Sequence, residues 1–215
     1  MSTRLEVLLT FRLHSGVHVT GERAQLWTDK ALVTDPQDGK TPVVPATTLK
    51  GWLRESAERL LRGLGHPACD GSRPAVMCGS CPVCALFGAP RRRPPLRFSD
   101  AVLKDSTTDV RMNVSLSRHR KTAYEERLFS TEVAWQRELT ARIQGWFDSQ
   151  AEARRAAALL YLAARAGFAI GAARSRGLGW LQLADFAASV DGEKLADEDL
   201  QNQSKAWMSQ TEGAG

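Results

Sequence analysis

The sequence predicts an α+β fold, with helices on one face of a sheet, and three observations lead to this prediction. Apolar residues alternate with polar ones at positions 4–13, which is the pattern of a half-buried strand. Two later segments, one beginning within 45–48 and one spanning 150–166, carry helix formers. The predicted order of strand, helix, strands, helix and strand fits a ferredoxin-like βαββαβ core. RNA-recognition domains commonly use this split βαβ arrangement.

The composition is that of a globular protein, with 43% hydrophobic and 25% charged residues, which excludes a wholly disordered chain. No segment approaches the ~18 uncharged apolar residues of a transmembrane helix. The N-terminal residues lack a basic region followed by an apolar run, so no secretory signal is expected. We therefore expect a cytoplasmic protein without a membrane partner.

Basic residues outnumber acidic ones, 29 to 24, and most of them are arginine. Acidic residues concentrate in 191–215, so the rest of the chain is more basic than the net charge of +5 suggests. Arginine presents a planar guanidinium whose donors match the oxygens of a phosphate. The positive net charge of the chain outside 191–215 favours a polyanionic partner. A GC-rich genome would also enrich arginine and alanine, and this alternative stays open.

Each predicted element follows from a local pattern. The first strand, residues 4–13, precedes a long excursion at 21–44 that contains turn residues. The first helix begins within 45–48, where a threonine is the expected N-cap, and ends at Gly63 or Gly65. After a loop rich in Cys, Gly, Pro and Arg, four strand patterns follow, at 96–104, 110–117, 128–135 and 138–147.

Residues 1–187 are predicted to form a single domain, into which the loop at 66–95 is inserted. After the second helix, a Gly-rich segment at 167–179 leads to the last strand at 180–187. Residues 188–215 are predicted to be a polar, flexible C-terminal tail.

The cysteines of the chain lie close together, with the spacing C-x8-C-x2-C-x2-C: Cys69, Cys78, Cys81 and Cys84. Four thiolates satisfy a tetrahedral Zn²⁺, and a complete set leaves no open position, so the predicted zinc site is structural. The loop has few apolar residues, and a metal would supply its order. Disulfides, unliganded thiols and an iron–sulfur cluster are the alternatives, and His66 could replace one sulfur.

Three segments carry a family resemblance. The first contains SGVHV at 15–19, TDKALVTDP at 28–36 and VPATTLKGWLR at 44–54. The second is CGSCPVCALFG at 78–88, and the third is IGAARSRGLG at 170–179. Together they resemble the RAMP superfamily of CRISPR-associated proteins, and most closely the backbone subunit of type III effector complexes.

The resemblance implies a guide-RNA-binding subunit that cleaves complementary single-stranded target RNA as a divalent-metal-dependent endoribonuclease. Its partners would be the guide, the target and other subunits of the complex, including further copies or paralogues of itself. The family's catalytic aspartate matches Asp29, with Mg²⁺ or another divalent ion as cofactor. Leu26-Trp27-Thr28 stands where the family usually has Gly-Gly-Ile. Asp35 and Asp38 fit turn formers instead, because Pro and Gly follow them.

RNA-binding residues are expected in three basic segments. The first helix offers N-terminal amides and the positive end of its dipole, which suit a phosphate. The Gly-rich segment lets a nucleic-acid backbone approach closely. The resemblance implies a thumb hairpin at about 110–135, which includes a run of cations. The candidates are Thr47, Thr48, Lys50, Arg54, Arg118, Arg120, Lys121, Arg174, Arg176 and Gly177.

Other interpretations of these segments stay open. The basic runs are also typical of solvated surfaces. With Asp29 idle, the chain would be a non-catalytic RNA-binding scaffold of the same kind of complex. With an iron–sulfur cluster at the cysteines, it would be a redox protein. His18, on an apolar strand pattern, is expected to be a packed histidine rather than a catalyst.

Overall fold

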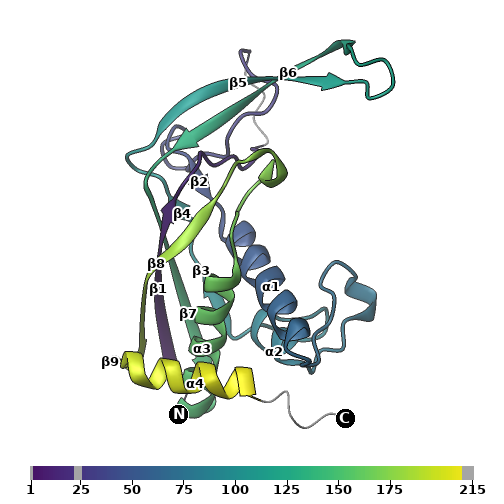
Figure 1. Ribbon diagram of the computed structural model, residues 1–215. Helices are drawn as coiled ribbons and strands as arrows, with labels where there is room; N and C mark the ends of the chain where they lie inside the picture. The colour runs from purple at the N-terminus through teal and green to yellow at the C-terminus, as the bar shows by residue number, and fades with distance from the viewer. Residues whose placement is uncertain (1, 22–25, 210–215) are drawn as a thin grey trace.

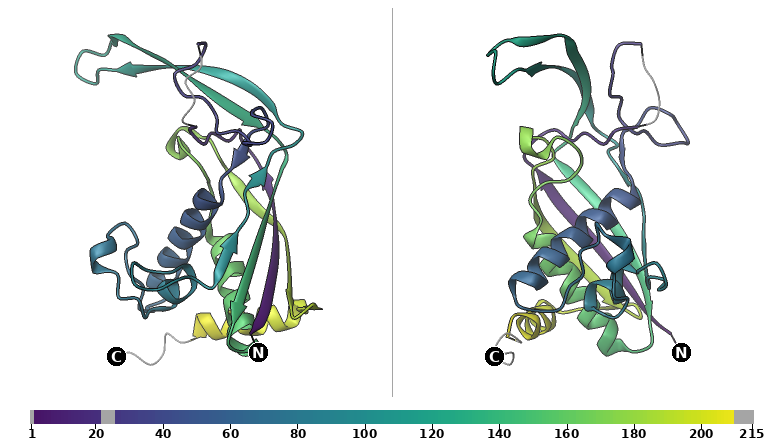
Figure 2. Two further views of the ribbon diagram at one scale, coloured as in Figure 1. Left: turned by 180° about the vertical axis from the view of Figure 1, so that it is seen from behind. Right: turned by 90° about the vertical axis from the view of Figure 1, so that its right-hand side faces the viewer.

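The computed structural model describes residues 2–21 and 26–209, and its α+β fold confirms the predicted class (Figure 1). A five-stranded sheet carries helices α1 (Ala46–Gly63) and α3 (Gln150–Ala166) on one face (Figure 2). A hairpin extends beyond one end of the sheet, and helix α4 (Asp197–Ser209) lies across the other end.

The main sheet is antiparallel throughout. Strand β1 (Thr3–Leu13) lies at its centre, between β7 (Glu138–Phe147) and β8 (Leu181–Val190). The short strands β3 (Leu96–Phe98) and β9 (Glu193–Lys194) form the edges, so the order is β3-β7-β1-β8-β9. Alternate residues of β1 are buried, as the period of a strand with one covered face requires.

The core fills the space between this sheet and the two long helices. Leu5 and Phe11 of β1 are fully buried, and Phe11 meets Trp52 of α1 edge to face, 5.3 Å between ring centroids. Full burial of such a side chain contributes ~1.5–3 kcal/mol. Ser149 caps α3, because its Oγ accepts the Glu152 N–H at 3.3 Å. The predicted span of this helix, 150–166, agrees with the structure.

The start of α1 differs from the prediction of a threonine cap. The N-cap is Pro45, and Thr47 and Thr48 lie inside the first turn. Because Pro45 has no side-chain acceptor, the Ala46 N–H donates to a carboxylate oxygen of Asp100 at 2.7 Å. The predicted threonine cap is therefore wrong: an aspartate distant in sequence supplies the capping oxygen.

The predicted single strand at 96–104 is also corrected. It is divided into β3 and β4 (Ala101–Val102), with Ser99 and Asp100 between them. Strand β3 joins the main sheet, whereas β4 pairs with β2 (Val43–Val44). This change of sheet brings Asp100 to the first turn of α1.

The hairpin consists of β5 (Thr107–Leu116) and β6 (Ala123–Trp135), paired antiparallel. Strand β6 begins earlier than predicted, so part of the charged segment 118–127 is extended. Several aliphatic side chains of the hairpin are exposed, namely Val110, Met112, Val114, Leu116 and Leu128.

The C-terminal segment corrects the prediction of a flexible tail from residue 188. Strand β8 continues to Val190, and α4 packs through Trp207, which is 4% exposed. The Arg155 guanidinium lies 4.4 Å from the Trp207 ring centroid, and the indole N–H donates to the Arg155 carbonyl. A few apolar residues in a polar segment are therefore enough to dock the helix. The last part of the predicted tail, 210–215, lies outside the described residues.

Gly167→Ala is expected to destabilise the fold at the end of α3. A Cβ at Gly167 would lie 2.2 Å from Cζ2 of Trp52, which is buried. Overpacking of this kind costs ~1–3 kcal/mol of unfolding free energy. Gly63→Ala is the matched control, because a Cβ there meets nothing within 4 Å. Thermal unfolding of both variants tests this, and equal melting temperatures for Gly167→Ala and the wild type would contradict it.

Candidate functional site

Asp29 lies at the base of the hairpin, where Ser130 of β6 holds its carboxylate. Oδ2 of Asp29 accepts the Ser130 N–H at 2.7 Å and the Ser130 hydroxyl at 2.9 Å. The Asp29 N–H donates in turn to the Ser130 Oγ at 2.9 Å. These hydrogen bonds, led by the Ser130 N–H, lower the pKa of the exposed Asp29 carboxyl. Asp29 is therefore an ionised, oriented carboxylate at neutral pH.

The segment that carries Asp29 runs beside β6. The Lys30 N–H donates to the Ser130 carbonyl at 3.2 Å, and the Glu132 N–H donates to the Lys30 carbonyl at 3.0 Å. The Leu32 N–H donates to a Glu132 carboxylate oxygen at 3.0 Å. These hydrogen bonds attach the segment that carries Asp29 to strand β6 of the hairpin. They therefore fix the position of Asp29 relative to Ser130.

Two cations lie near the Phe129 ring, next to Ser130 in the sequence. The Lys30 ammonium lies 4.9 Å from the Phe129 ring centroid, and the Arg176 guanidinium lies 5.8 Å from it. Arg176 belongs to a short 3₁₀ turn, η2 (Arg174–Arg176), in the Gly-rich segment. Because Phe129 precedes Ser130, the tertiary structure brings Lys30 and Arg176 close to the residue that holds Asp29. Sequence reasoning missed Ser130 and Phe129, and no local motif marks them.

His18 is a packed residue, as expected. It is 1% exposed, and its two ring nitrogens lie 2.7 Å from the Glu132 carbonyl and 2.9 Å from the Thr20 hydroxyl. Burial lowers its pKa, so the ring is neutral at neutral pH. A carbonyl only accepts, so Nδ1 carries the proton and Nε2 accepts from Thr20.

A groove of about 340 Å³ separates the first turn of α1 from the Gly-rich segment. Thr47 and Thr48 line one side, and Gly171 and Arg174 line the other. Gly171 has φ +85°, and a Cβ there would lie 2.5 Å from the His18 carbonyl oxygen. Arg174 also pairs with Glu55 of α1 at 3.0 Å. The groove therefore brings together two segments that the sequence analysis proposed separately.

The remaining predicted cations do not share this groove. Arg118, Arg120 and Lys121 are exposed in the turn that joins β5 to β6, at the far end of the hairpin (Figure 1). Lys50 is half-buried near the start of α1, where burial lowers its pKa. Gly177 follows η2 with φ +84° and is exposed. The predicted set therefore occupies several sites rather than one continuous patch.

Arg54, a predicted RNA contact, does not line the groove. Its side chain is only 16% exposed and points to the cysteine loop instead of the groove. Its Nε and Nη1 donate to Glu58 Oε1 and to the Gly88 carbonyl, each at 2.8 Å. These guanidinium donors are thus used inside the protein.

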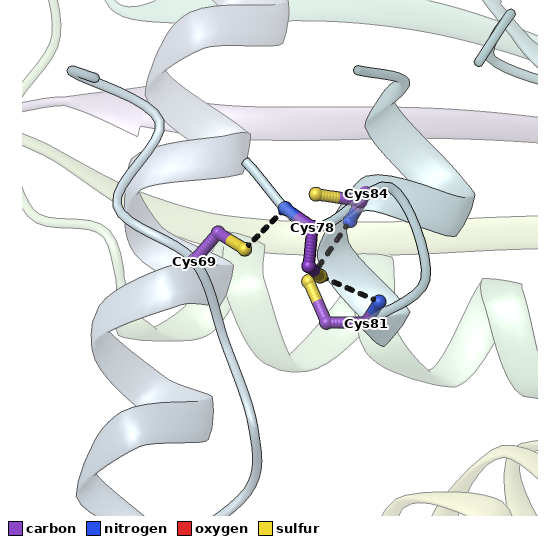
Figure 3. Close-up of side chains that lie close together, drawn as sticks. All are labelled: Cys69, Cys78, Cys81 and Cys84. Atoms are coloured by element: carbon purple, nitrogen blue, oxygen red, sulfur yellow. Dashed lines mark hydrogen bonds between the residues drawn. The ribbon is translucent and has the colours of Figure 1, made fainter. Parts of the chain in front are cut away.

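The four cysteine sulfurs point toward one centre and lie within 4.8 Å of one another (Figure 3). All four thiols are free, and Cys81 and Cys84 are buried at helix α2 (Pro82–Phe87). Sulfurs around a tetrahedral zinc at ~2.3 Å are ~3.8 Å apart, so the cluster needs to contract by only ~1 Å. Cys69 and Cys78 come from the loop before α2, which includes the 3₁₀ turn η1 (Pro74–Val76). This donor set fits a metal that prefers sulfur.

Backbone amides support this centre. The N–H groups of Ser80 and Cys81 point at the Cys78 sulfur, at 3.4 and 3.2 Å. Hydrogen bonds from Ser80 and Cys81 lower the pKa of Cys78 to about 5, which favours the thiolate that a metal binds. His66 is not a ligand in this arrangement, because its Nε2 lies 2.7 Å from the Trp207 carbonyl. The suggestion that His66 replaces a sulfur is therefore corrected.

Comparison with protein families identifies the superfamily of the chain. The sequence profile of the RAMP superfamily matches residues 25–182, well over half of the chain. The chain belongs to the RAMP superfamily. A search of curated proteins found no match. The region of this RAMP protein that matches includes Asp29, α1, the cysteine centre and the Gly-rich segment.

Membership of the superfamily indicates a CRISPR-associated subunit that binds RNA. The basic composition of this RAMP protein agrees with such a partner. In the part of the chain that the structure describes, no helix has both the length and the apolar character needed to cross a bilayer.

Proposed function

We propose that this RAMP protein is a guide-RNA-binding backbone subunit of a type III CRISPR interference complex, and that it cleaves complementary target RNA at Asp29. The observation that carries the proposal is the ionised Asp29 carboxylate, held by Ser130 at the base of a projecting hairpin. The hairpin would be the thumb that divides the bound RNA into segments. Cleavage at regular intervals would follow from repetition of the subunit along the guide.

The proposed chemistry is transfer of a phosphoryl group of the target strand from the 5′-oxygen of one nucleotide to the 2′-oxygen of the preceding ribose. Asp29 accepts the 2′-hydroxyl proton, the 2′-oxygen forms a bond to phosphorus, and the bond from phosphorus to the 5′-oxygen breaks. The 5′-oxygen takes a proton from water, and Asp29 returns its proton to the hydroxide so formed. The products are a 2′,3′-cyclic phosphate and a 5′-hydroxyl. Lys30 and Arg176 would stabilise the added negative charge. A divalent ion bound at Asp29 would supply further charge stabilisation.

The architecture supports a ferredoxin-like assignment for the core, within one domain that spans most of the chain. Strands β3, β7, β1 and β8 are neighbours in that order, with α1 after β1 and α3 after β7. This is the connectivity of a split βαβ sheet. The cysteine loop is an insertion between α1 and β3, and we propose that it binds a structural Zn²⁺.

The guide would follow the groove between α1 and the Gly-rich segment. Thr47, Thr48 and Arg174 offer hydroxyl and guanidinium donors there, and helix dipoles favour anions at this end of α1. Such contacts hold phosphates and leave sequence recognition to base pairing. The exposed cations at the hairpin tip, Arg118, Arg120 and Lys121, would extend the phosphate contacts.

Arg174→Ala is expected to weaken guide binding without changing its sequence preference. Loss of one phosphate contact lowers the slope of log affinity against log salt by about 1. Arg165→Ala is the control, because Arg165 lies at the exposed end of α3 and contacts Tyr161. Guide binding measured at several salt concentrations tests this. An unchanged slope for Arg174→Ala would remove Arg174 from the guide path.

The test of the whole proposal is incubation of the assembled, guide-loaded complex with complementary RNA and Mg²⁺. Evenly spaced products support the nuclease, and binding without cleavage supports a scaffold. One observation favours the scaffold as the second candidate. Trp27, two residues before Asp29, is 67% exposed and stands where the family usually has a small residue. An indole there would alter how RNA reaches the carboxylate.

A further inference from the structure

Arg54 and Glu58 lie one turn apart on α1, where that helix meets the cysteine loop. Their side chains are 16% and 6% exposed, and Arg54 Nε lies 2.8 Å from Glu58 Oε1. A charged pair this deeply buried is costly unless further hydrogen bonds satisfy both groups. The partners that satisfy this pair come from the cysteine loop.

Arg54 binds the inner half of the loop, which contains α2. Nη1 donates to the Gly88 carbonyl at 2.8 Å, at the end of α2. Nη2 lies 3.8 Å from the Cys84 sulfur and 3.9 Å from the Met77 sulfur, the residue before Cys78. One guanidinium therefore contacts a cysteine sulfur and both ends of the segment that carries Cys78, Cys81 and Cys84.

Glu58 binds the outer half of the loop. Its Oε2 accepts the Gly71 N–H at 3.1 Å, two residues after Cys69. The approach is close, because a Cβ at Gly71 would lie 2.6 Å from Glu58 Oε1 and 2.7 Å from Arg54 Nε. Arg62 adds a second, looser cation at 3.8 Å from Glu58. A side chain at position 71 would therefore displace the Arg54–Glu58 pair from its present position.

We propose that Arg54 and Glu58 are the positioning pair of the metal centre. They hold both halves of the cysteine loop on α1, so that Cys69 meets the sulfurs of α2, and they place a cation beside Cys84. This inference rests on the proposed metal site. It also gives Arg54, the last residue of the VPATTLKGWLR segment, a role other than RNA contact.

The charge of the centre explains why a guanidinium is suited to this place. Four thiolates carry more negative charge than a divalent ion neutralises. An N–H group directed at a ligand sulfur offsets part of that excess and fixes the sulfur's orientation. Glu58 orients the guanidinium through Nε, which leaves Nη2 directed at Cys84. A lysine has the charge but not this fixed, forked geometry.

The test uses the full-length chain loaded with Zn²⁺ and, separately, with Co²⁺, in four variants. Arg54→Met removes the positive charge, and Arg54→Lys keeps the charge but not the forked guanidinium. Glu58→Gln keeps the shape of the side chain but removes its negative charge. Arg59→Met is the matched control, because Arg59 is exposed on the same helix and lies over Phe168. The measurements are the rate of metal loss to a chelator and the sulfur-to-cobalt charge-transfer absorption.

Loss of such a supporting contact lowers metal affinity by ~10–100-fold, and we expect Arg54→Met to release metal faster by a similar factor. Arg54→Lys and Glu58→Gln should lie between it and the wild type, and Arg59→Met should match the wild type. The charge-transfer band should shift in Arg54→Met, because the sulfur loses its donor. The gap in melting temperature between metal-loaded and metal-free protein should narrow, since weaker binding stabilises less. A merely structural role would lower both melting temperatures equally.

Three results would overturn the inference. Wild-type chelation rates and an unshifted band in Arg54→Met, or in Arg54→Lys if the methionine variant does not fold, would show that the pair does not position the ligands. Lower guide affinity with unchanged metal retention would make Arg54 an RNA contact. A wild-type chain that takes up neither Zn²⁺ nor Co²⁺ would remove the metal site itself, and that result is read from the wild type alone.

Discussion

Asp29→Asn is expected to slow target-RNA cleavage by the assembled, guide-loaded complex by ~10²–10⁴-fold, the usual contribution of a general base. The asparagine oxygen can still accept the hydrogen bonds from Ser130, so the loop should stay in place. The amide, however, cannot take the 2′-hydroxyl proton and is a poor ligand for a divalent cation. Binding of guide and target should therefore be unchanged.

Single-turnover cleavage rates, with binding measured in parallel, are the readout for this variant. Asp35→Asn is the control in the same loop, because the Asp35 Oδ1 only accepts the Gln37 N–H of a turn. The pKa of Asp29 lies below that of an ordinary carboxyl, so its ionised form persists as the pH falls through the usual carboxylate range. The cleavage rate should therefore fall through protonation of Asp29 only at a pH below that range.

The two alternative outcomes have distinct meanings. Cleavage at the wild-type rate by Asp29→Asn would falsify the assignment of Asp29 as the base. Binding without cleavage by the wild type as well would make the chain a scaffold. In that case Trp27→Gly would show whether the indole next to the loop is the obstacle.

Removing metal from the cysteine centre is expected to produce the largest change in stability. A metal present at a thousandfold excess over its dissociation constant contributes about 4 kcal/mol, all of which is lost on chelation. For a chain of this size, that corresponds to a fall of ~8–16 °C in melting temperature. The part of the cysteine loop from Cys69 through η1 should unfold first, because it buries little apolar surface of its own.

Calorimetry with and without a chelator, together with metal analysis, checks this expectation. Cys81→Ser should reproduce the effect of chelation, since Cys81 is a buried member of the cluster. Val76→Ala is the control in the same loop, because the Val76 side chain is 65% exposed. Equal melting temperatures with and without the chelator would mean unliganded thiols. Iron and sulfide in a coloured preparation would favour the redox alternative.

Regular elements with strong local patterns were predicted well. The alternation at the start of the chain corresponds to β1, and the helix formers at 150–166 correspond to α3 with its Ser149 cap. In both cases the pattern that predicted the element lies within it, so local sequence was sufficient. The same holds for the cysteine cluster, because short turns bring nearby ligands together.

Elements that depend on distant contacts were predicted less well. The α1 cap failed because Asp100, far along the chain, provides the oxygen. The C-terminal helix was missed because its docking depends on single residues such as Trp207, which leave no periodic signal in a polar segment. Arg54 was assigned to RNA because its segment is basic, whereas its partners lie on a loop that folds back onto the helix.

The sequence alone determined the fold class, the clustering of the cysteines and the superfamily, because each is encoded in residues that are close together. Only the tertiary structure decided how Asp29 is held, since Ser130 is 101 residues away in the chain. The structure also separated Arg174, which lines the groove, from Arg54, which contacts the cysteine loop. Charge is visible in a sequence, but the direction of a side chain depends on the packing of segments that are far apart in it.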